Sequence, residues 1–191
     1  MDIQKQLFVG PRIILGPIDH ENDPPVLSRW SHDPEYLRLL EVEPVYPISV
    51  FQAQKKLEAL EKELDEGKNL CFFTIRTRES DRLLGFASIR WIEWEHGAGW
   101  IHMGIGDRRD WRQGYGTETL DLLLEYAFSE LNLYRLGAEI IEYNLGARHL
   151  FEKAGFTEEV RRRQALSRDG RRWDLLLYGL LCQEWEARHA E

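Results

Sequence analysis

Residues 111–117 read Trp-Arg-Gln-Gly-Tyr-Gly-Thr, and they stand between an expected strand and an expected helix. The glycines Gly114 and Gly116 allow a tight turn and a close approach of the backbone to a ligand. The first N–H groups of a helix have no internal acceptor, and with the helix dipole they attract an anion. Arg112 and two arginines just before it add positive charge. The loop therefore predicts a site for a phosphate or diphosphate, with a simply capped helix start as the alternative when the loop is taken alone.

Two common nucleotide-binding loops fit this segment poorly. A Walker loop ends in Gly-Lys followed by Ser or Thr, and that ending is absent. A dinucleotide-binding loop needs a third glycine at the position of Thr119, and it normally belongs to an early strand–helix–strand unit. Another phosphate-bearing cofactor is therefore favoured.

His102 is the first candidate for a catalytic base. It belongs to the strand expected at residues 100–106, where alternation places it on the same face as Trp100 and Gly104. An imidazole has an ordinary pKa near neutrality, which suits proton transfer. A core or surface histidine is the alternative interpretation.

Other side chains could assist such chemistry or bind its substrate. Glu93 and Glu95 are second candidates for the base, directly or through water, and Tyr143 is a candidate acid. Glu41 and Glu43 lie in a loop broken by prolines, where they could recognise a cationic acceptor. Solvated charges and structural packing are the alternatives for all five.

Periodicity and turn signals predict the elements that position these residues. We expect strands at residues 7–15 (broken by Pro11), 70–77, 83–94, 100–106, 135–142, 156–166 and 172–181. We expect helices at residues 25–31, 34–40, 49–67, 116–131 and 147–154. Short connections favour an antiparallel meander, followed by one strand–helix–strand crossover, with helices on both faces. One domain spanning residues 1–191, with a tail that frays from about residue 186, is the simplest partition.

Composition limits the class of protein. The 191 residues carry a net charge of −8, which argues against a nucleic-acid binder. Cys71 and Cys182 lie far apart and predict neither a disulfide framework nor a metal pair. The first residues do not resemble a signal peptide, and no apolar run is long enough for a membrane span. We therefore expect a soluble cytoplasmic protein without a membrane or nucleic-acid partner.

Three segments resemble motifs of the GNAT superfamily of acetyltransferases. The run Ile105-Gly-Asp-Arg-Arg-Asp-Trp-Arg-Gln-Gly-Tyr-Gly-Thr-Glu118 is similar to its acetyl-CoA loop, most of all in the RimJ/RimL branch and the neighbouring polyamine acetyltransferases. Residues 144–156, which read Asn-Leu-Gly-Ala-Arg-His-Leu-Phe-Glu-Lys-Ala-Gly-Phe, resemble a second motif of the family. Residues 170–174, Gly-Arg-Arg-Trp-Asp, lead into an apolar strand as they do in that branch.

The resemblance implies a fold and a reaction. The fold is α+β, with a mixed, mostly antiparallel, twisted sheet of about seven strands and helices on both faces. The reaction is direct transfer of an acetyl group from acetyl-CoA to a primary amine, such as a protein N-terminus, a polyamine or another small amine. It needs no metal, and homodimers are frequent in the family. A degenerate acyl-CoA-binding module without turnover is the alternative.

The resemblance also implies roles for single residues. Backbone amides of the loop hold the diphosphate, and the end of the preceding strand lies along the pantetheine arm. Asn144 bonds to pantetheine, and Phe151 packs beside the cofactor or in the core. The loop and strand residues are Arg112, Gln113, Gly114, Tyr115, Gly116 and Thr117, and Met103, Gly104 and Ile105. A helix N-cap is the alternative for Asn144. Many relatives carry a tyrosine in place of Phe151, which acts as the acid toward the leaving thiolate. Many also carry a glutamate near the position of Trp100 and a glycine about where His102 stands. Trp100 is instead a candidate for lining the acceptor pocket.

Overall fold

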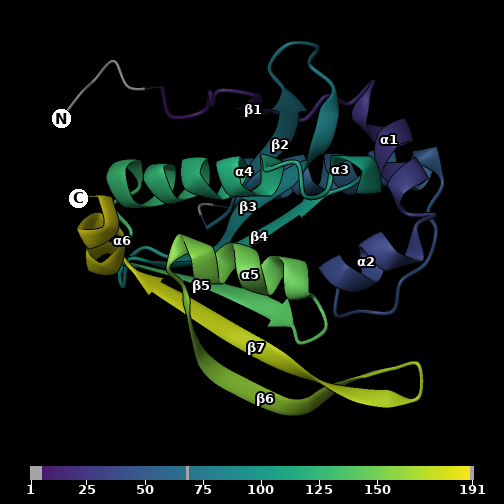
Figure 1. Ribbon diagram of the computed structural model, residues 1–191. Coiled ribbons are helices and arrows are strands. Elements are labelled where there is room, and N and C mark those ends of the chain that lie inside the picture. Colours follow the sequence, from purple (N-terminus) through teal and green to yellow (C-terminus); the bar gives the residue numbers. More distant parts are fainter. Residues whose placement is uncertain (1–5, 68, 190–191) are drawn as a thin grey trace.

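The computed structural model describes residues 6–67 and 69–189. Its centre is a seven-stranded sheet in the order β1-β2-β3-β4-β5-β7-β6 (Figure 1). The strands are β1 Ile13–Gly16, β2 Cys71–Thr77, β3 Leu83–Glu93, β4 Ala98–Ile105, β5 Arg135–Ile141, β6 Thr157–Arg168 and β7 Arg171–Leu181. Only β4 and β5 pair in parallel, and all other neighbours are antiparallel. The predicted fold class is confirmed.

Helices cover both faces of the sheet. They are α1 Asp23–Trp30, α2 Pro34–Leu40, α3 Val50–Glu66, η1 Arg108–Asp110, α4 Tyr115–Glu125, η2 Tyr126–Glu130, α5 Leu145–Ala154 and α6 Cys182–His189. In Figure 1, α4 and α5 lie side by side over one face. There Leu120 and Leu124 of α4 belong to the same buried apolar cluster as Ile101 of β4 and Leu136 of β5. Gly104 faces the other way, and a Cβ on it would meet Leu40 of α2.

The first strand is shorter than the sequence predicts. Gly10 N donates to Ile13 O at 2.9 Å, and Val9 forms a bridge with Ile14. The chain therefore reverses at Pro11, which cannot donate a ladder hydrogen bond. The segment predicted at residues 7–15 thus folds back on itself, and only β1 continues as the edge strand.

Two helical segments differ from the prediction. The helix expected over residues 116–131 ends as a single π-helical turn, Tyr126–Glu130. The chain was expected to fray from about residue 186, but α6 runs to His189. Trp185 is 9% exposed and its ring lies 5.4 Å from that of Phe128, while Arg188 Nη2 donates to Lys153 O at 2.8 Å. Tertiary contacts hold this short helix, and the rest of the expected frayed end, residues 190–191, lies outside the described residues.

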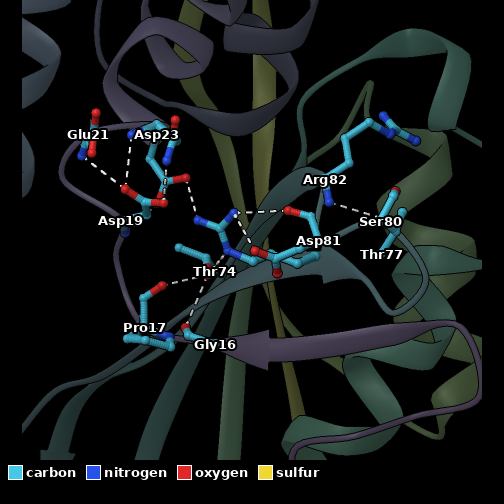
Figure 2. Close-up of polar contacts among 12 residues, drawn as sticks. Gly16, Pro17, Asp19, Glu21, Asp23, Thr74, Thr77, Ser80, Asp81 and Arg82 are labelled. Carbon is cyan, nitrogen blue, oxygen red and sulfur yellow. Dashed lines mark hydrogen bonds and ion pairs between the residues drawn. The ribbon is translucent and has the colours of Figure 1, made fainter.

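A buried ion pair fixes α1 to the sheet (Figure 2). Asp23, at the start of α1, is 1% exposed and accepts from Arg76 Nη2 of β2 at 2.5 Å. Arg76 Nε also donates to Thr74 Oγ1, which donates to Pro17 O after β1. Removing one member of such a pair typically costs about 3–5 kcal/mol, because the other charge stays buried. The network thus joins α1, β1 and β2.

No helix in the described part of the chain is both long and apolar enough to cross a membrane.

Candidate active site

The two parallel strands separate part-way along their length. Pairing between β4 and β5 runs from Ala98 opposite Arg135 to Ile101 opposite Ala138, and there it ends. Beyond that point β4 continues to pair with β3, and β5 continues to pair with β7. The end of β4 therefore has an edge that no described strand covers.

Main-chain groups of two residues face this open edge. Gly106 N donates to Leu84 O at 2.8 Å, so alternate residues of β4 bond to β3. Met103 and Ile105 consequently turn their N–H and C=O groups toward the diverging β5, where an extended ligand could pair with them like an added strand. Gly104, which was predicted with them, instead directs its main-chain groups to β3.

The glycine loop follows directly and leads into α4. Arg112 and Gly114 have φ angles of 58° and 86°, both in the left-handed region. Left-handed residues among right-handed ones turn successive N–H groups to one side, which is the geometry of an anion-binding concavity. No side chain of the described residues caps α4. The N–H groups of Tyr115, Gly116 and Thr117 therefore open the helix with no side-chain acceptor.

The arginines around the loop differ in what they bind. Arg108 pairs with Asp33, the N-cap of α2, and with Glu35 in the first turn of that helix, and Arg109 pairs with Asp107. Their charge is thus already neutralised, whereas Arg112 is exposed and forms no ion pair among the described residues. Of the three arginines predicted to add charge, only Arg112 is therefore free to bind a phosphate.

Arg12, which no local sequence pattern indicates, reaches the loop from the position just before β1. Its Nη1 donates to Gln113 O at 2.7 Å, and its Nε donates to Glu118 Oε2 at 3.0 Å. Its guanidinium lies over the ring of Tyr115, 5.1 Å from the centroid. Arg12 therefore fixes the loop from the neighbouring strand, while its own charge is balanced by Glu118.

His102 lies on the face of β4 that α2 covers. Its ring is 5.4 Å from that of Phe86, and its Nδ1 is buried without a partner among the described residues. Burial, and then the positive charge of Arg90, lower the pKa of His102 to about 4, against a smaller raising effect of the Leu40 carbonyl. The prediction of a base rested on the ordinary pKa near neutrality, whereas the desolvated ring stays neutral well below pH 7. It can accept a proton, but only as a weak base.

Tyr143 and Asn144 join the start of α5 to the end of α2. Tyr143 Oη donates to Arg38 O and accepts from Arg168 Nη1, each at 2.7 Å, and burial raises the pKa of its phenol. Its proton is therefore engaged, which argues against the predicted acid. Asn144 Oδ1 accepts from Ala147 N, and its Nδ2 donates to Leu39 O. The structure thus has Asn144 as the N-cap, the alternative interpretation.

Two aromatic residues occupy the positions where relatives carry polar groups. Phe151 is 5% exposed and its ring packs against Phe156 at 5.0 Å, so it belongs to the core rather than to an open cofactor surface. Trp100 is half-buried over Gly137, where an added Cβ would lie 2.8 Å from Trp100 Cε3. Its indole therefore lies beside the point at which β4 and β5 part.

The predicted glutamates lie at the margins. Glu93 and Glu95 are exposed at the β3–β4 connection, as expected for solvated charges. The main-chain oxygens of Glu41 and Glu43 accept from Arg168 Nη2 at the tip of β6. A hollow of about 310 Å³ opens there, lined by Arg38, Val42, Pro44, Val45, Ser167, Arg168 and Asp169. Within the described residues, no three His, Cys, Asp or Glu side chains form a metal-ligand group.

An open strand edge that ends in an anion-binding helix start suits a long cofactor with a diphosphate. A family model described as an acetyltransferase (GNAT) domain matches residues 12–157. The chain belongs to the GNAT acetyltransferase family. This membership makes it an N-acetyltransferase, as the motifs predicted, and it supports acetyl-CoA as the co-substrate.

Known GNAT proteins resemble the chain over most of its length. It is 28% identical over 163 residues to the uncharacterized N-acetyltransferase p20 of Bacillus licheniformis, which covers 85% of this chain and 89% of that one. The spermidine N-acetyltransferase of Vibrio cholerae, solved with CoA and spermine, has a TM-score of 0.78 at 19% identity, over 93% of this chain and 99% of that one. A Vibrio cholerae protein provisionally named a ribosomal-protein-serine acetyltransferase has a TM-score of 0.72 at 22% identity, over 91% and 96%. At these identities the two solved structures establish the fold alone.

Proposed function

We propose that the protein transfers an acetyl group from acetyl-CoA directly to a primary amine. The observation that carries this proposal is the open edge of β4 leading straight into the uncapped start of α4. The diphosphate binds the N–H groups of residues 112–117, and pantetheine lies along Met103 and Ile105. The thioester then reaches the region of His102 and Trp100.

The transfer itself needs no covalent intermediate on the protein. The neutral amine attacks the thioester carbonyl carbon, the C–S bond breaks, and the thiolate of CoA leaves. A lysine-like amine with a pKa of about 10.4 is neutral in roughly one molecule in two thousand at pH 7, so a proton acceptor helps. Solvent takes the proton of the ammonium form before the attack. His102 takes the proton that the amine nitrogen loses after it has bonded to the carbonyl carbon, when that nitrogen is far more acidic, and the imidazolium formed can return it to the thiolate, since Phe151 has no proton to donate. An N–H of β4 polarises the carbonyl, and fixed positioning contributes much of the rate.

The acceptor is an amine such as a protein N-terminus, a polyamine or another small amine. Similarity of residues 105–118 to the RimJ/RimL branch supports a protein N-terminus, whereas the spermidine N-acetyltransferase shares the fold. We also propose that the chain is a single domain, that it acts in the cytoplasm without a metal, a membrane or a nucleic acid, and that it forms a homodimer. A CoA-binding module without turnover is the second candidate, and Phe151 and Trp100 are the residues that favour it.

A carboxylate introduced at the start of α4 tests whether the diphosphate of the cofactor binds there. Gly116 and Gly146 are the second residues of α4 and α5, and a Cβ on either meets nothing closer than 3.5 Å. We expect acetyl-CoA to raise the melting temperature of the wild type and of Gly146→Asp, but not of Gly116→Asp, because the added carboxylate repels the diphosphate. Thiol release with a panel of amines then measures turnover. Equal binding by both variants contradicts the site, and binding without turnover of any amine favours the second candidate.

A further inference from the structure

Arg90 is a second charged residue on the sheet face that carries His102. It lies on β3 opposite Trp100 of β4, and Ser88, two residues earlier, lies opposite His102. Arg90 Nε donates to Ser88 Oγ, and Ser88 Oγ donates to His102 O, each at 3.1 Å. The guanidinium thus sits beside the imidazole, one strand from the place where β4 and β5 part.

This guanidinium has no carboxylate partner. Arg90 forms no ion pair with any described residue, and its only hydrogen bond to one is the bond from Nε. Glu41 and Glu63 act on it only from longer range, and burial lowers its pKa. Arg76, a buried arginine on β2, is by contrast paired with Asp23. The two Nη groups of Arg90 have no partner among the described residues and are not enclosed, so they are open to an anionic ligand.

Its neighbours indicate where that ligand lies. The buried Nδ1 of His102 also lacks a partner among the described residues, and it is on the same face. Trp100 is half-buried beside them. A cation and an unpaired polar nitrogen therefore stand together at the expected position of the thioester.

We propose that the two free Nη groups of Arg90 bind a carboxylate of the acceptor, which is therefore an amine that also carries an acidic group. This inference rests on the proposed function. A planar guanidinium and a carboxylate form two parallel hydrogen bonds, and the pair is strongest where water is partly excluded. A polyamine offers only further positive charge, which an unpaired guanidinium repels. The carboxylate belongs either to a free amino acid or to the second residue of a peptide.

Binding tests the proposal without requiring turnover. The CoA-bound wild type, Arg90→Gln and Arg162→Gln are titrated calorimetrically with N-acetyl amino acids, N-acetyl-Ala-Asp and N-acetylspermidine. Arg162→Gln removes the same charge from an exposed position on β6 and serves as the control. We expect an anionic ligand to bind the wild type and the control, and to bind Arg90→Gln about tenfold to hundredfold more weakly. Binding of N-acetylspermidine alone, or of no anionic ligand, overturns the proposal, as does equal affinity for Arg90→Gln.

Turnover separates failure of this inference from failure of the proposed function. Amino acids are compared with their carboxamides, the C-terminally amidated dipeptide Ala-Asp-amide with Ala-Asn-amide, and all of them with spermidine. We expect kcat/KM to favour the member with the carboxylate, and the ratio within each pair to fall in Arg90→Gln and to recover in part in Arg90→Lys. The pair with the larger ratio of kcat/KM shows whether the acceptor is a free amino acid or a peptide. Efficient turnover of spermidine alone overturns the role of Arg90 but leaves the proposed acetyltransferase activity intact. If none of the amines causes thiol release, the proposed function itself is overturned.

Discussion

Arg12 donates a hydrogen bond from Nη1 to the main-chain oxygen of Gln113 at 2.7 Å, across 101 positions of the sequence. The same side chain pairs with Glu118 of α4 and lies over the ring of Tyr115. One residue at the start of β1 thus fixes the conformation of the loop that we assign to the diphosphate.

We expect Arg12→Ala to weaken acetyl-CoA binding about tenfold, with little change in kcat at saturating cofactor. A hydrogen bond from a charged donor contributes about 1.5–3 kcal/mol, and part of this is lost when the loop relaxes. Calorimetric titration with CoA measures the change, and Arg162→Ala on the exposed side of β6 is the control. An unchanged Kd for CoA in Arg12→Ala refutes the role of Arg12.

The sequence indicates the local parts of the site and not the contacts between distant segments. Gly114 and the N-cap Asn144 follow local rules of helix starts, and both appear where those rules place them. Arg12 and Arg90 carry no local signal, because their partners depend on strand register and on packing. Tyr143 shows the same limit: its sequence position suits an acid, but its hydroxyl meets a carbonyl 105 residues away.

His102 makes a prediction about stability and pH. Its pKa is lowered from 6.5 to about 4 in the folded protein, so the unfolded chain binds the proton more readily between these values. The contribution of neutral His102 to stability is therefore complete above pH 6.5 and is lost as pH falls toward 4. The loss amounts to about 3 kcal/mol, at 1.36 kcal/mol per pKa unit.

Urea denaturation at pH 7 and pH 4.5 measures this effect. We expect the wild type to lose more free energy of unfolding between the two pH values than His102→Gln does, because glutamine does not titrate. His32→Gln, a part-buried histidine of the α1–α2 connection, is the control and should lose as much as the wild type. Equal losses in the wild type and His102→Gln contradict a depressed pKa. His102→Gln should also lower kcat without a comparable change in the Kd for CoA.

Arg168 connects the β6–β7 hairpin to the chain between α2 and α3. Its guanidinium donates to Arg38 O at 2.8 Å and to Glu43 O at 3.0 Å, and it also contacts the oxygens of Glu41 and Tyr143. These contacts define one wall of the hollow at the hairpin tip, which we infer to be part of the acceptor site. We expect Arg168→Ala to raise KM for the acceptor about tenfold, because the wall loses several charge-assisted hydrogen bonds. KM for acetyl-CoA should stay the same, since the hydrogen bonds of Arg168 go to Arg38, Glu41, Glu43 and Tyr143 and none goes to a described residue of the glycine loop.

Steady-state kinetics with each substrate varied in turn separates these two effects. Arg171→Ala is the matched control, because Arg171 is exposed and lies opposite Arg168 across the Asp169–Gly170 turn. Hydrogen exchange gives an independent measurement: the amides of residues 41–47 should exchange faster in Arg168→Ala and not in the control. A parallel rise in KM for acetyl-CoA means that Arg168 supports the fold as a whole, and it would remove the hairpin tip from the acceptor site.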